Sequence, residues 1–384
     1  MVGTVYRRVH RRAFLIGVCG LAIALRLVVG VVLLSQGGSS FVLASDDGDA
    51  YDAAARWQAL GTPIVMTERL RGKWDPAVPV EARWPQGYWL LLAAQYRLFG
   101  SAYASTLVVQ GLLAAGGVLA VFALASSVLS EGAARVAALA QAVSSTGIYI
   151  SAALYAESLY VPLLLGGLAL VAGRVGVSRR SSCGLRAALV AGALFGLAEV
   201  TRPLAVAVLG VAALWLAWAG TAPAGVRARR MVALCAGFLV ALAPFVAHDL
   251  ATLGRVAVFT AGGAEALRDQ ASAGDSLVER AFTLFIAGGW APLGEPPISS
   301  LGGLGTLVGR LAEWVLAAVG GVWLLARRGR SAGGAGWLLV GGAAAIVAPA
   351  LAVGLPLVRY RVPADPLFII MMVAGVQALR GAEK

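Results

Sequence analysis

The sequence predicts an all-α protein, a polytopic membrane helix bundle. The chain of 384 residues is 59% hydrophobic and only 13% charged, with a mean hydropathy of +0.82. Apolar runs of about 20 residues, the length that crosses a bilayer core as a helix, recur along it. The net charge is +12, but the basic residues gather at the ends of these runs, which favours membrane anchoring over nucleic-acid binding. Helices packed together in lipid form one unit, so we expect a single domain over residues 1–384.

About ten transmembrane helices are expected. The first run, 13–36, follows four arginines and is long for a signal peptide, so we interpret it as a retained helix. Residues 187–220 are enough for two short helices that turn at Thr201-Arg202-Pro203. The other runs are expected to cross once each: 103–129, 136–150, 156–173, 231–247, 306–326, 333–355 and 363–379.

The distribution of charge predicts the orientation of the chain. With the N-terminus inside, cytoplasmic segments hold 17 of the 31 Lys and Arg residues but only Glu131 and Glu383 among the 19 acids. Both termini are then cytoplasmic. Two long loops, residues 37–102 and 248–305, fall on the extracytoplasmic side of the cell (inner) membrane.

The first of these loops, 37–102, concentrates the acidic residues. Small and apolar residues at helical spacing predict an interfacial helix over 50–60, capped by Asp49 and ended by Gly61. Aromatic residues further along, Trp84, Tyr88 and Trp89, are expected in the lipid headgroup belt. Seven of the 19 acids lie in the loop: Asp46, Asp47, Asp49, Asp52, Glu68, Asp75 and Glu81.

Six motifs follow one another in a characteristic order. In the first motif, Asp47 and Asp46 stand four and five residues, respectively, before the aromatic Tyr51. The second motif, WPQGYWLLLAAQYRLFG, begins at Trp84. AESLY, LAEVTRP, LAPFVAHDLATLGRVAVFTAGG and RYRVPADPLFII come later. Together they resemble the GT-C superfamily of membrane glycosyltransferases, which includes protein O-mannosyltransferases and lipid A aminoarabinose transferases. Two positions depart from the pattern: Gln86 replaces a second proline, and His248-Asp249 replace an Arg-Asn pair.

The resemblance implies a GT-C-like fold and the transfer of a sugar from a polyprenyl-phosphate carrier to an extracytoplasmic glycan, lipid or protein. The implied partners are the lipid-linked sugar donor, the acceptor and the bilayer, without nucleic acid. No metal ligands are assigned, and a need for a divalent cation is left open. A transporter or lipid flippase is the alternative, but such folds usually carry inverted repeats and charges near the bilayer midplane.

The proposed chemistry selects the candidate residues. An acceptor hydroxyl loses its proton as it attacks the anomeric carbon, which requires a carboxylate within hydrogen-bond reach. Asp47 is the first candidate, because its four-residue offset from Tyr51 matches the family spacing better than that of Asp46. Asp46 is the second candidate for this carboxylate, and Glu157 is the third. Arginine suits a departing phosphate, and four arginines are expected near the outer face. These donor-phosphate candidates are Arg83, Arg202, Arg359 and Arg361, and the candidate substrate-binding residues are Tyr51, Tyr88 and His248.

Structural roles remain open for several of these residues. Glu157 begins a span, where an acid also complements the helix dipole. Glu199 and Arg202 are one turn apart and can neutralise each other. Arg26, in the middle of the first span, is expected to be snorkelling or internally paired, because a lone charge there is costly. The remaining alternatives are membrane anchoring for Arg359 and Arg361, and a structural role for His248.

Overall fold

The computed structural model is helical, and the part of the chain that it describes contains no strand. The described residues are 2–36, 47–65, 67, 70, 79, 83–101, 103–175, 181–218, 222–256, 301–326, 332–353 and 362–382.

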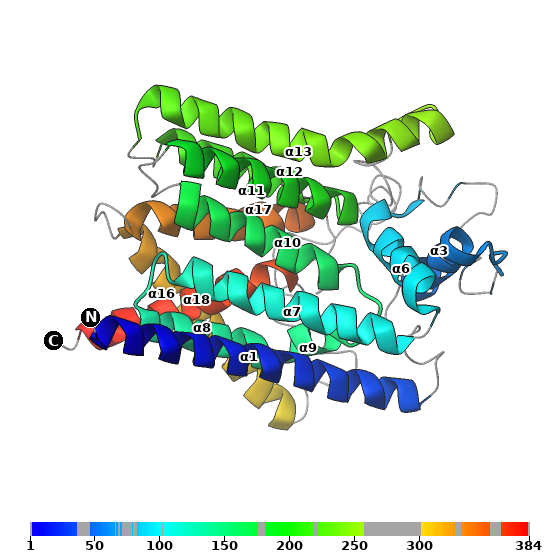
Figure 1. The fold of residues 1–384 in the computed structure, drawn as a ribbon. Helices are drawn as coiled ribbons and strands as arrows, with labels where there is room; N and C mark the ends of the chain where they lie inside the picture. Colours follow the sequence, from blue (N-terminus) through cyan, green and yellow to red (C-terminus); the bar gives the residue numbers. More distant parts are fainter. Residues whose placement is uncertain are drawn as a thin grey trace.

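Most helices lie side by side in one bundle, and both chain termini lie at the same end of it (Figure 1). We call this the terminal end. The opposite end carries α3 (Gly48–Leu60) and α6 (Gln86–Phe99), and we call it the α3–α6 end. The bundle itself is formed by α1 (Val2–Ser35), α7 (Tyr103–Ala125), α8 (Glu131–Val143), α9 (Ser145–Ser151), α10 (Glu157–Leu170), α11 (Ser181–Thr201), α12 (Ala205–Trp218), α13 (Ala224–Leu253), α16 (Leu301–Ala326), α17 (Ala332–Val353) and α18 (Asp365–Ala382).

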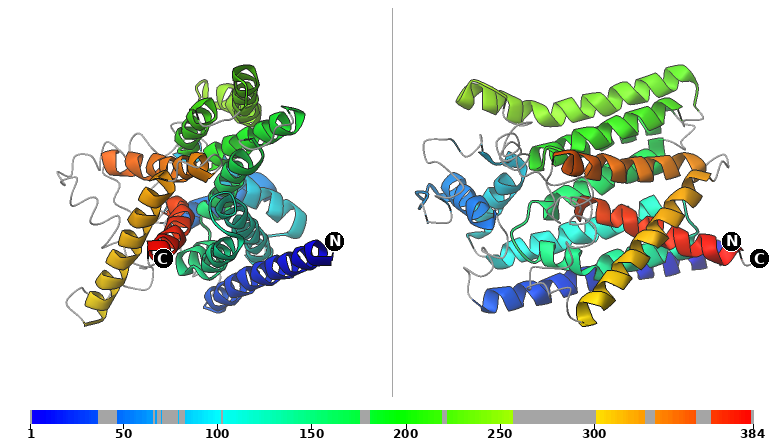
Figure 2. Two further views of the ribbon diagram at one scale, coloured as in Figure 1. Left: turned by 90° about the vertical axis from the view of Figure 1, so that its left-hand side faces the viewer. Right: turned by 180° about the vertical axis from the view of Figure 1, so that it is seen from behind.

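Short irregular helices and bends mark the ends of some of these elements. A π-helical turn, Val171–Val175, extends α10, and a 3-10 turn, Val362–Ala364, precedes α18. Pro244 lies inside α13, where a proline removes a backbone hydrogen bond, and this helix is bent (Figure 1). α16 crosses its neighbours obliquely (Figure 2).

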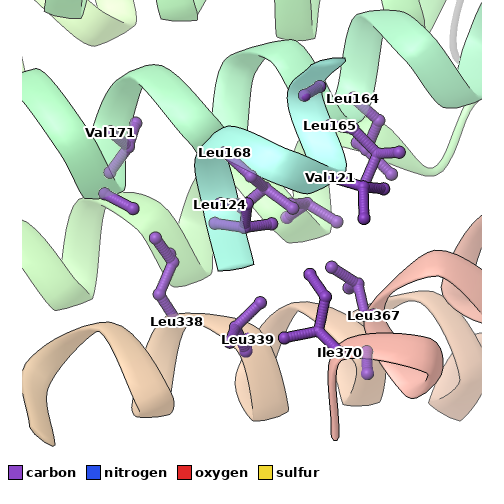
Figure 3. Packing of buried hydrophobic residues seen from close by; sticks show 14 of the residues in the cluster. Val121, Leu124, Leu164, Leu165, Leu168, Val171, Leu338, Leu339, Leu367 and Ile370 are labelled. Atoms are coloured by element: carbon purple, nitrogen blue, oxygen red, sulfur yellow. The ribbon is translucent and has the colours of Figure 1, made fainter. Parts of the chain in front are cut away.

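The centre of the bundle is an apolar core. Figure 3 shows leucine, isoleucine and valine side chains of α7, α10, α17 and α18 packed against one another. Lipid tails are as apolar as these side chains, so van der Waals packing, more than release from water, holds such helices together. The labelled residues are Val121, Leu124, Leu164, Leu165, Leu168, Val171, Leu338, Leu339, Leu367 and Ile370.

The hydropathy of the helices confirms a polytopic membrane bundle. Within the described residues, five helices are long and apolar enough to cross a bilayer: Val9–Ser35, Tyr103–Ala125, Gly184–Thr201, Ala224–Leu253 and Val362–Arg380. Shorter apolar helices lie beside them: Glu157–Gly173, Ala205–Trp218, Ala312–Ala326 and Ala335–Ala348. The expected division of 187–220 is also confirmed, because α11 ends at Thr201 and α12 begins at Ala205.

Two expected boundaries are wrong. The run 136–150 is not one helix, because the chain breaks at Ser144, whose hydroxyl accepts a hydrogen bond from Gly147 N at 3.3 Å and caps α9. α13 continues to Leu253, so the first residues of the expected loop 248–305 are helical. Residues 257–300 lie outside the described part of the chain.

The helix expected over 50–60 exists, but its cap and its buried face differ from those expected. α3 begins at Gly48, so Asp47 is the N-cap residue and Asp49 lies in the first turn; Gly61 ends the helix in the left-handed conformation, at φ 66°. α3 packs on α6 and thereby covers aromatic side chains expected at the headgroups. Trp84 is only 6% exposed, Tyr88 0% and Trp89 1%.

Candidate active site

The candidate site lies at the α3–α6 end of the bundle. The N-terminus of α6 rests directly on the C-terminus of α11, where a Cβ at Gly87 would lie 2.9 Å from Thr201 N. A buried cluster joins α3, α6 and the segment before α10, and it includes Tyr51, Tyr88, Leu154 and Ala156. Tyr51 follows Asp47 by four residues and Ala156 directly precedes Glu157. The fold thus brings the two predicted acidic motifs to one hydrophobic cluster.

Tyr51 and Tyr88 form the centre of this contact. Their rings meet edge to face, with centroids 5.1 Å apart. The Tyr88 hydroxyl donates to Gln110 Oε1 at 3.3 Å and also lies within hydrogen-bond reach of Ser158, next to Glu157. Tyr51 N donates to the backbone carbonyl of Asp47 at 3.0 Å, which places Asp47 at the first turn of α3. Both tyrosines therefore connect α3 to the start of α10.

Glu157 and Arg202 form a buried ion pair. Glu157 is the first residue of α10, and its Oε1 accepts from Arg202 Nη1. The side chains are 2% and 13% exposed, respectively. The structure thus brings together one predicted catalytic residue and one predicted phosphate-binding residue that lie 45 positions apart.

The expected pairing of Glu199 with Arg202 is wrong. Pro203 ends the helical path after Thr201, so the two side chains no longer share a helix face. Glu199 instead turns to the start of α12, where its Oε2 accepts from Val206 N at 2.8 Å. This bond satisfies a backbone donor that a helix N-terminus leaves unpaired.

The two departures from the family pattern meet in the structure. Gln86 Nε2 donates to Asp249 Oδ1 at 2.5 Å, and both side chains are buried. The bond ties the N-terminus of α6 to α13 across 163 positions. Neither motif predicts this contact, because Gln86 and Asp249 belong to separate motifs 163 positions apart.

A small cavity with polar and apolar walls lies among the helices, and sequence reasoning missed most of its wall. Its volume is about 40 Å³, and Arg26, Gln141, Glu157 and Asp365 line it. Arg26 is expected to snorkel or to be paired internally. It is instead 1% exposed, donates only to backbone carbonyls within the described residues, and faces this cavity. The sequence feature that could have predicted this cavity is the presence of polar residues such as Gln141 inside apolar spans.

The remaining predicted site residues are Arg83, His248, Asp46, Arg359 and Arg361. Arg83 is half-buried just before α6, and His248 is exposed on α13. Asp46, Arg359 and Arg361 fall outside the described residues. Within the described residues, no three His, Cys, Asp or Glu side chains gather in a way that would hold a metal ion.

No protein-family model matches this chain, and no curated protein matches it. Among solved structures, the crystal structure of ArnT from Cupriavidus metallidurans bound to undecaprenyl phosphate is similar, with a TM-score of 0.57 and 17% identity. The match covers 93% of this chain and 59% of that one. An oligosaccharyltransferase from Archaeoglobus fulgidus, tethered with an acceptor peptide, matches with a TM-score of 0.48 and 13% identity over 94% of this chain and 49% of that one. The fold of this chain, a bundle of membrane helices, is therefore similar to that of ArnT, and the chain spans 59% of the length of that protein.

Proposed function

We propose that this protein is an integral membrane glycosyltransferase. It moves a sugar from a polyprenyl-phosphate carrier to an extracytoplasmic acceptor, with Asp47 as general base. The observation that carries the proposal is the buried Glu157–Arg202 pair beside Tyr51 and Tyr88, at one end of an ArnT-like bundle. The pair holds a guanidinium for the departing phosphate near the start of α3, where Asp47 is the carboxylate for the acceptor proton.

The reaction exchanges one bond at the anomeric carbon for another. The acceptor oxygen forms a bond to that carbon as its proton passes to a carboxylate. The bond from the same carbon to the carrier phosphate breaks, and the phosphate oxygen leaves with the electron pair. Negative charge grows on the phosphate, so an arginine positioned there lowers the barrier.

The two acids have different surroundings, which support different roles. Asp47 is the N-cap residue of α3 and is partly exposed, so an acceptor hydroxyl can reach its carboxylate. Glu157 is buried and held by Arg202, so it orients the arginine and is the reserve candidate for the base. The apolar helices beneath the site are long enough to accompany a prenyl chain.

Asp47→Asn tests the proposal. Asparagine keeps the size of the side chain and its backbone geometry but accepts no proton, so transfer should fall by about 10²- to 10⁴-fold. The measurement is transfer of a labelled sugar from its polyprenyl-phosphate carrier by the full chain in lipid vesicles.

Glu131→Gln is the matched control. It removes one carboxylate at the terminal end, where Glu131 forms an exposed bond with Arg135, and should leave transfer unchanged. If the parent protein moves the labelled carrier between leaflets without transferring its sugar, the chain is a flippase and the proposal is wrong. If Asp47→Asn transfers the sugar as well as the parent does, the general base is another residue, and Glu157 is the first alternative.

A further inference from the structure

A short turn, residues 202–204, carries Arg202 between α11 and α12. Its first residue is tied to α11, because Arg202 N donates to Ala198 O at 2.8 Å. Pro203 follows, with a ring that fixes its own φ, and Leu204 N donates to Arg202 O at 2.8 Å. Arg202 is the guanidinium proposed above for the departing phosphate. The shape of this turn therefore sets where that guanidinium lies.

The side chain of Glu199 holds the other end of the turn. Its Oε2 accepts from Val206 N at 2.8 Å, and the carboxylate also lies within hydrogen-bond reach of Ala205 N. These are the first two N–H groups of α12, and a helix leaves such groups without a partner of its own. Glu199 therefore reaches from the last turn of α11 past the turn 202–204 and fastens the start of α12.

The carboxylate of Glu199 is deeply buried. Its side chain is 0% exposed, and none of the ion pairs in the described part of the chain includes it. Its Oε1 has no hydrogen-bond partner among the described residues. A buried carboxylate is costly, but the N-terminus of α12 carries partial positive charge and offsets part of that cost. Glu199 and the start of α12 therefore stabilise each other, and this contact resists movement of the turn between them.

Helix α6 presses on the same turn from another side. Gly87 lies so close to the end of α11 that a Cβ there would be 2.9 Å from Thr201 N and 3.0 Å from Thr201 Cα. Thr201 is 1% exposed, and its hydroxyl donates to Leu197 O at 2.7 Å. The residue directly before Arg202 is thus fixed by close packing on α6, and the residues directly after the turn are fixed by Glu199.

We propose that Glu199 is a positioning residue for Arg202 and, through it, for the donor phosphate. The inference rests on the proposed function and deepens it, because Glu199 touches neither sugar nor phosphate and acts only through the turn. Glu157 orients the guanidinium from α10, and Glu199 fixes the backbone from which that side chain extends. Such fixation matters, since a misplacement of about 1 Å at a reacting site can reduce a rate by about 10²-fold.

The test is the affinity of the purified full chain, in lipid nanodiscs, for undecaprenyl phosphate. Glu199→Met keeps the length of the side chain but removes both acceptor oxygens, so the affinity should fall by about tenfold or more. Glu199→Gln loses the charge but keeps an oxygen that can accept from Val206 N, so it should stay within about threefold of the parent. A loss in Glu199→Gln as large as in Glu199→Met would show that the hydrogen bond to α12 is not what matters and would overturn the proposal.

A double-mutant cycle separates positioning from a general effect on stability. If Glu199 acts through Arg202, its removal matters only while the arginine is present. Glu199→Met should therefore change the affinity by less than about twofold in an Arg202→Met background. A further loss of about tenfold in that background would show that Glu199 acts by another route. Parent-like affinity of Arg202→Met alone would remove the phosphate from Arg202. Either result would overturn the inference.

Tyr160→Phe is the matched control. Tyr160 of α10 is 0% exposed and lies within electrostatic range of Glu199, and its hydroxyl has no hydrogen-bond partner among the described residues. The variant removes a buried polar atom beside Glu199 without touching the bond to α12, so the affinity should stay within about twofold of the parent. A loss as large as that of Glu199→Met would show a general effect of buried polar groups and overturn the proposal.

If Glu199→Met does not fold, Glu199→Asp replaces it. Aspartate keeps the charge and both oxygens but is one methylene too short to reach Val206 N from the same backbone position. A several-fold loss of affinity that disappears in the Arg202→Met background supports the proposal, and an unchanged affinity overturns it.

The proposed function and this inference can fail separately. Binding of undecaprenyl phosphate requires neither sugar nor acceptor. An effect of Glu199 that depends on Arg202, without any transfer of sugar by the parent, would therefore contradict the proposed function alone. Transfer by the parent, together with parent-like affinity of Glu199→Met, would contradict the inference alone.

Discussion

Glu157 and Arg202 illustrate how single residues define this site. Each carries a charge that would be costly alone at its depth, and the pair removes that cost only while both are present. The Gln86–Asp249 bond follows the same logic, because it buries an amide and a carboxylate that satisfy each other. These two contacts join α10 to α11 and α6 to α13. Together, the two contacts link neighbouring helices at the α3–α6 end of the bundle.

Breaking the ion pair should therefore destabilise the protein strongly. Glu157→Gln leaves Arg202 without its counter-charge and should lower the free energy of unfolding by about 3–5 kcal/mol. The double variant Glu157→Gln/Arg202→Met should lose less than the sum of the two single variants, since neither charge is then stranded. The measurement is denaturant unfolding in detergent micelles.

The exposed pair of Glu131 and Arg135 is the control for this cycle. Its side chains are 49% and 34% exposed, so Glu131→Gln should cost about 0.5 kcal/mol or less. Equal losses at Glu131 and Glu157 would show that the buried pair contributes no more than a surface pair.

Sequence patterns identified several site residues but not their partners. Glu157, Arg202, Tyr51 and Tyr88 were selected as candidates because each sits in a motif, and their roles stay predictions. The pairing of Glu157 with Arg202 was not, since contacts across 45 positions leave no periodic signal. Arg26 was recognised as costly but not as part of a cavity, because the cavity wall comes from six separate α-helices.

At the scale of elements, α3 is held in place by a network centred on Asp52. Its carboxylate accepts from Arg56 Nε at 2.9 Å, Tyr96 of α6 at 2.7 Å and Tyr103 of α7 at 3.1 Å. Burial and then the charge of Asp52 raise the pKa of Tyr96. Burial alone would lower the pKa of Arg56, but the hydrogen bond to Asp52 and its attraction raise it. Both donors thus stay protonated, and α3 stays anchored over the site, across the pH range of ordinary assays.

Element positions were more predictable than element contacts. Periodicity located α3 and the turn between α11 and α12, because both depend on local residues such as Gly61 and Pro203. The tendency of aromatic residues to lie at the lipid headgroups predicted such positions for Trp84, Tyr88 and Trp89, but these side chains are buried in the contact between α3 and α6. Periodicity shows which residues are apolar, but a helix such as α3 can cover the apolar face as well as lipid can.

Close helix packing gives a prediction at this scale. Gly237 of α13 lies against the backbone of α11, where a Cβ would collide with the carbonyl of Leu189. Gly237→Ala must therefore push two helices apart and should lower the free energy of unfolding by about 1–3 kcal/mol. Gly116→Ala, in α7, meets no atom within 4 Å and should be neutral or slightly stabilising. The measurement is the unfolding midpoint of each variant in the same detergent. If Gly116→Ala destabilises the protein as much as Gly237→Ala does, the packing argument is wrong.

At the scale of the whole molecule, the two ends of the bundle differ in character. The terminal end carries both chain termini and the start of α8, and the α3–α6 end carries the acid–arginine pair and the cavity of Arg26 (Figure 1). The charge distribution predicts that the terminal end is cytoplasmic. If so, the phosphate of a carrier that enters from lipid and an acceptor that enters from outside would meet at the α3–α6 end.

Two cysteine substitutions test this orientation. Thr62 follows α3, Gly132 lies in the first turn of α8 at the terminal end, and both are exposed. In a background with Cys19, Cys183 and Cys235 replaced, Thr62→Cys should react with a membrane-impermeant thiol reagent added to intact cells. Gly132→Cys should react only after the membrane is opened, because the bilayer separates the reagent from the terminal end. Reaction of Gly132→Cys in intact cells, with Thr62→Cys protected, would invert the protein and place Asp47 and the Arg26 cavity on the cytoplasmic side. The acceptor would then have to be cytoplasmic, and the extracytoplasmic reaction proposed above would be wrong even if the site residues were correct.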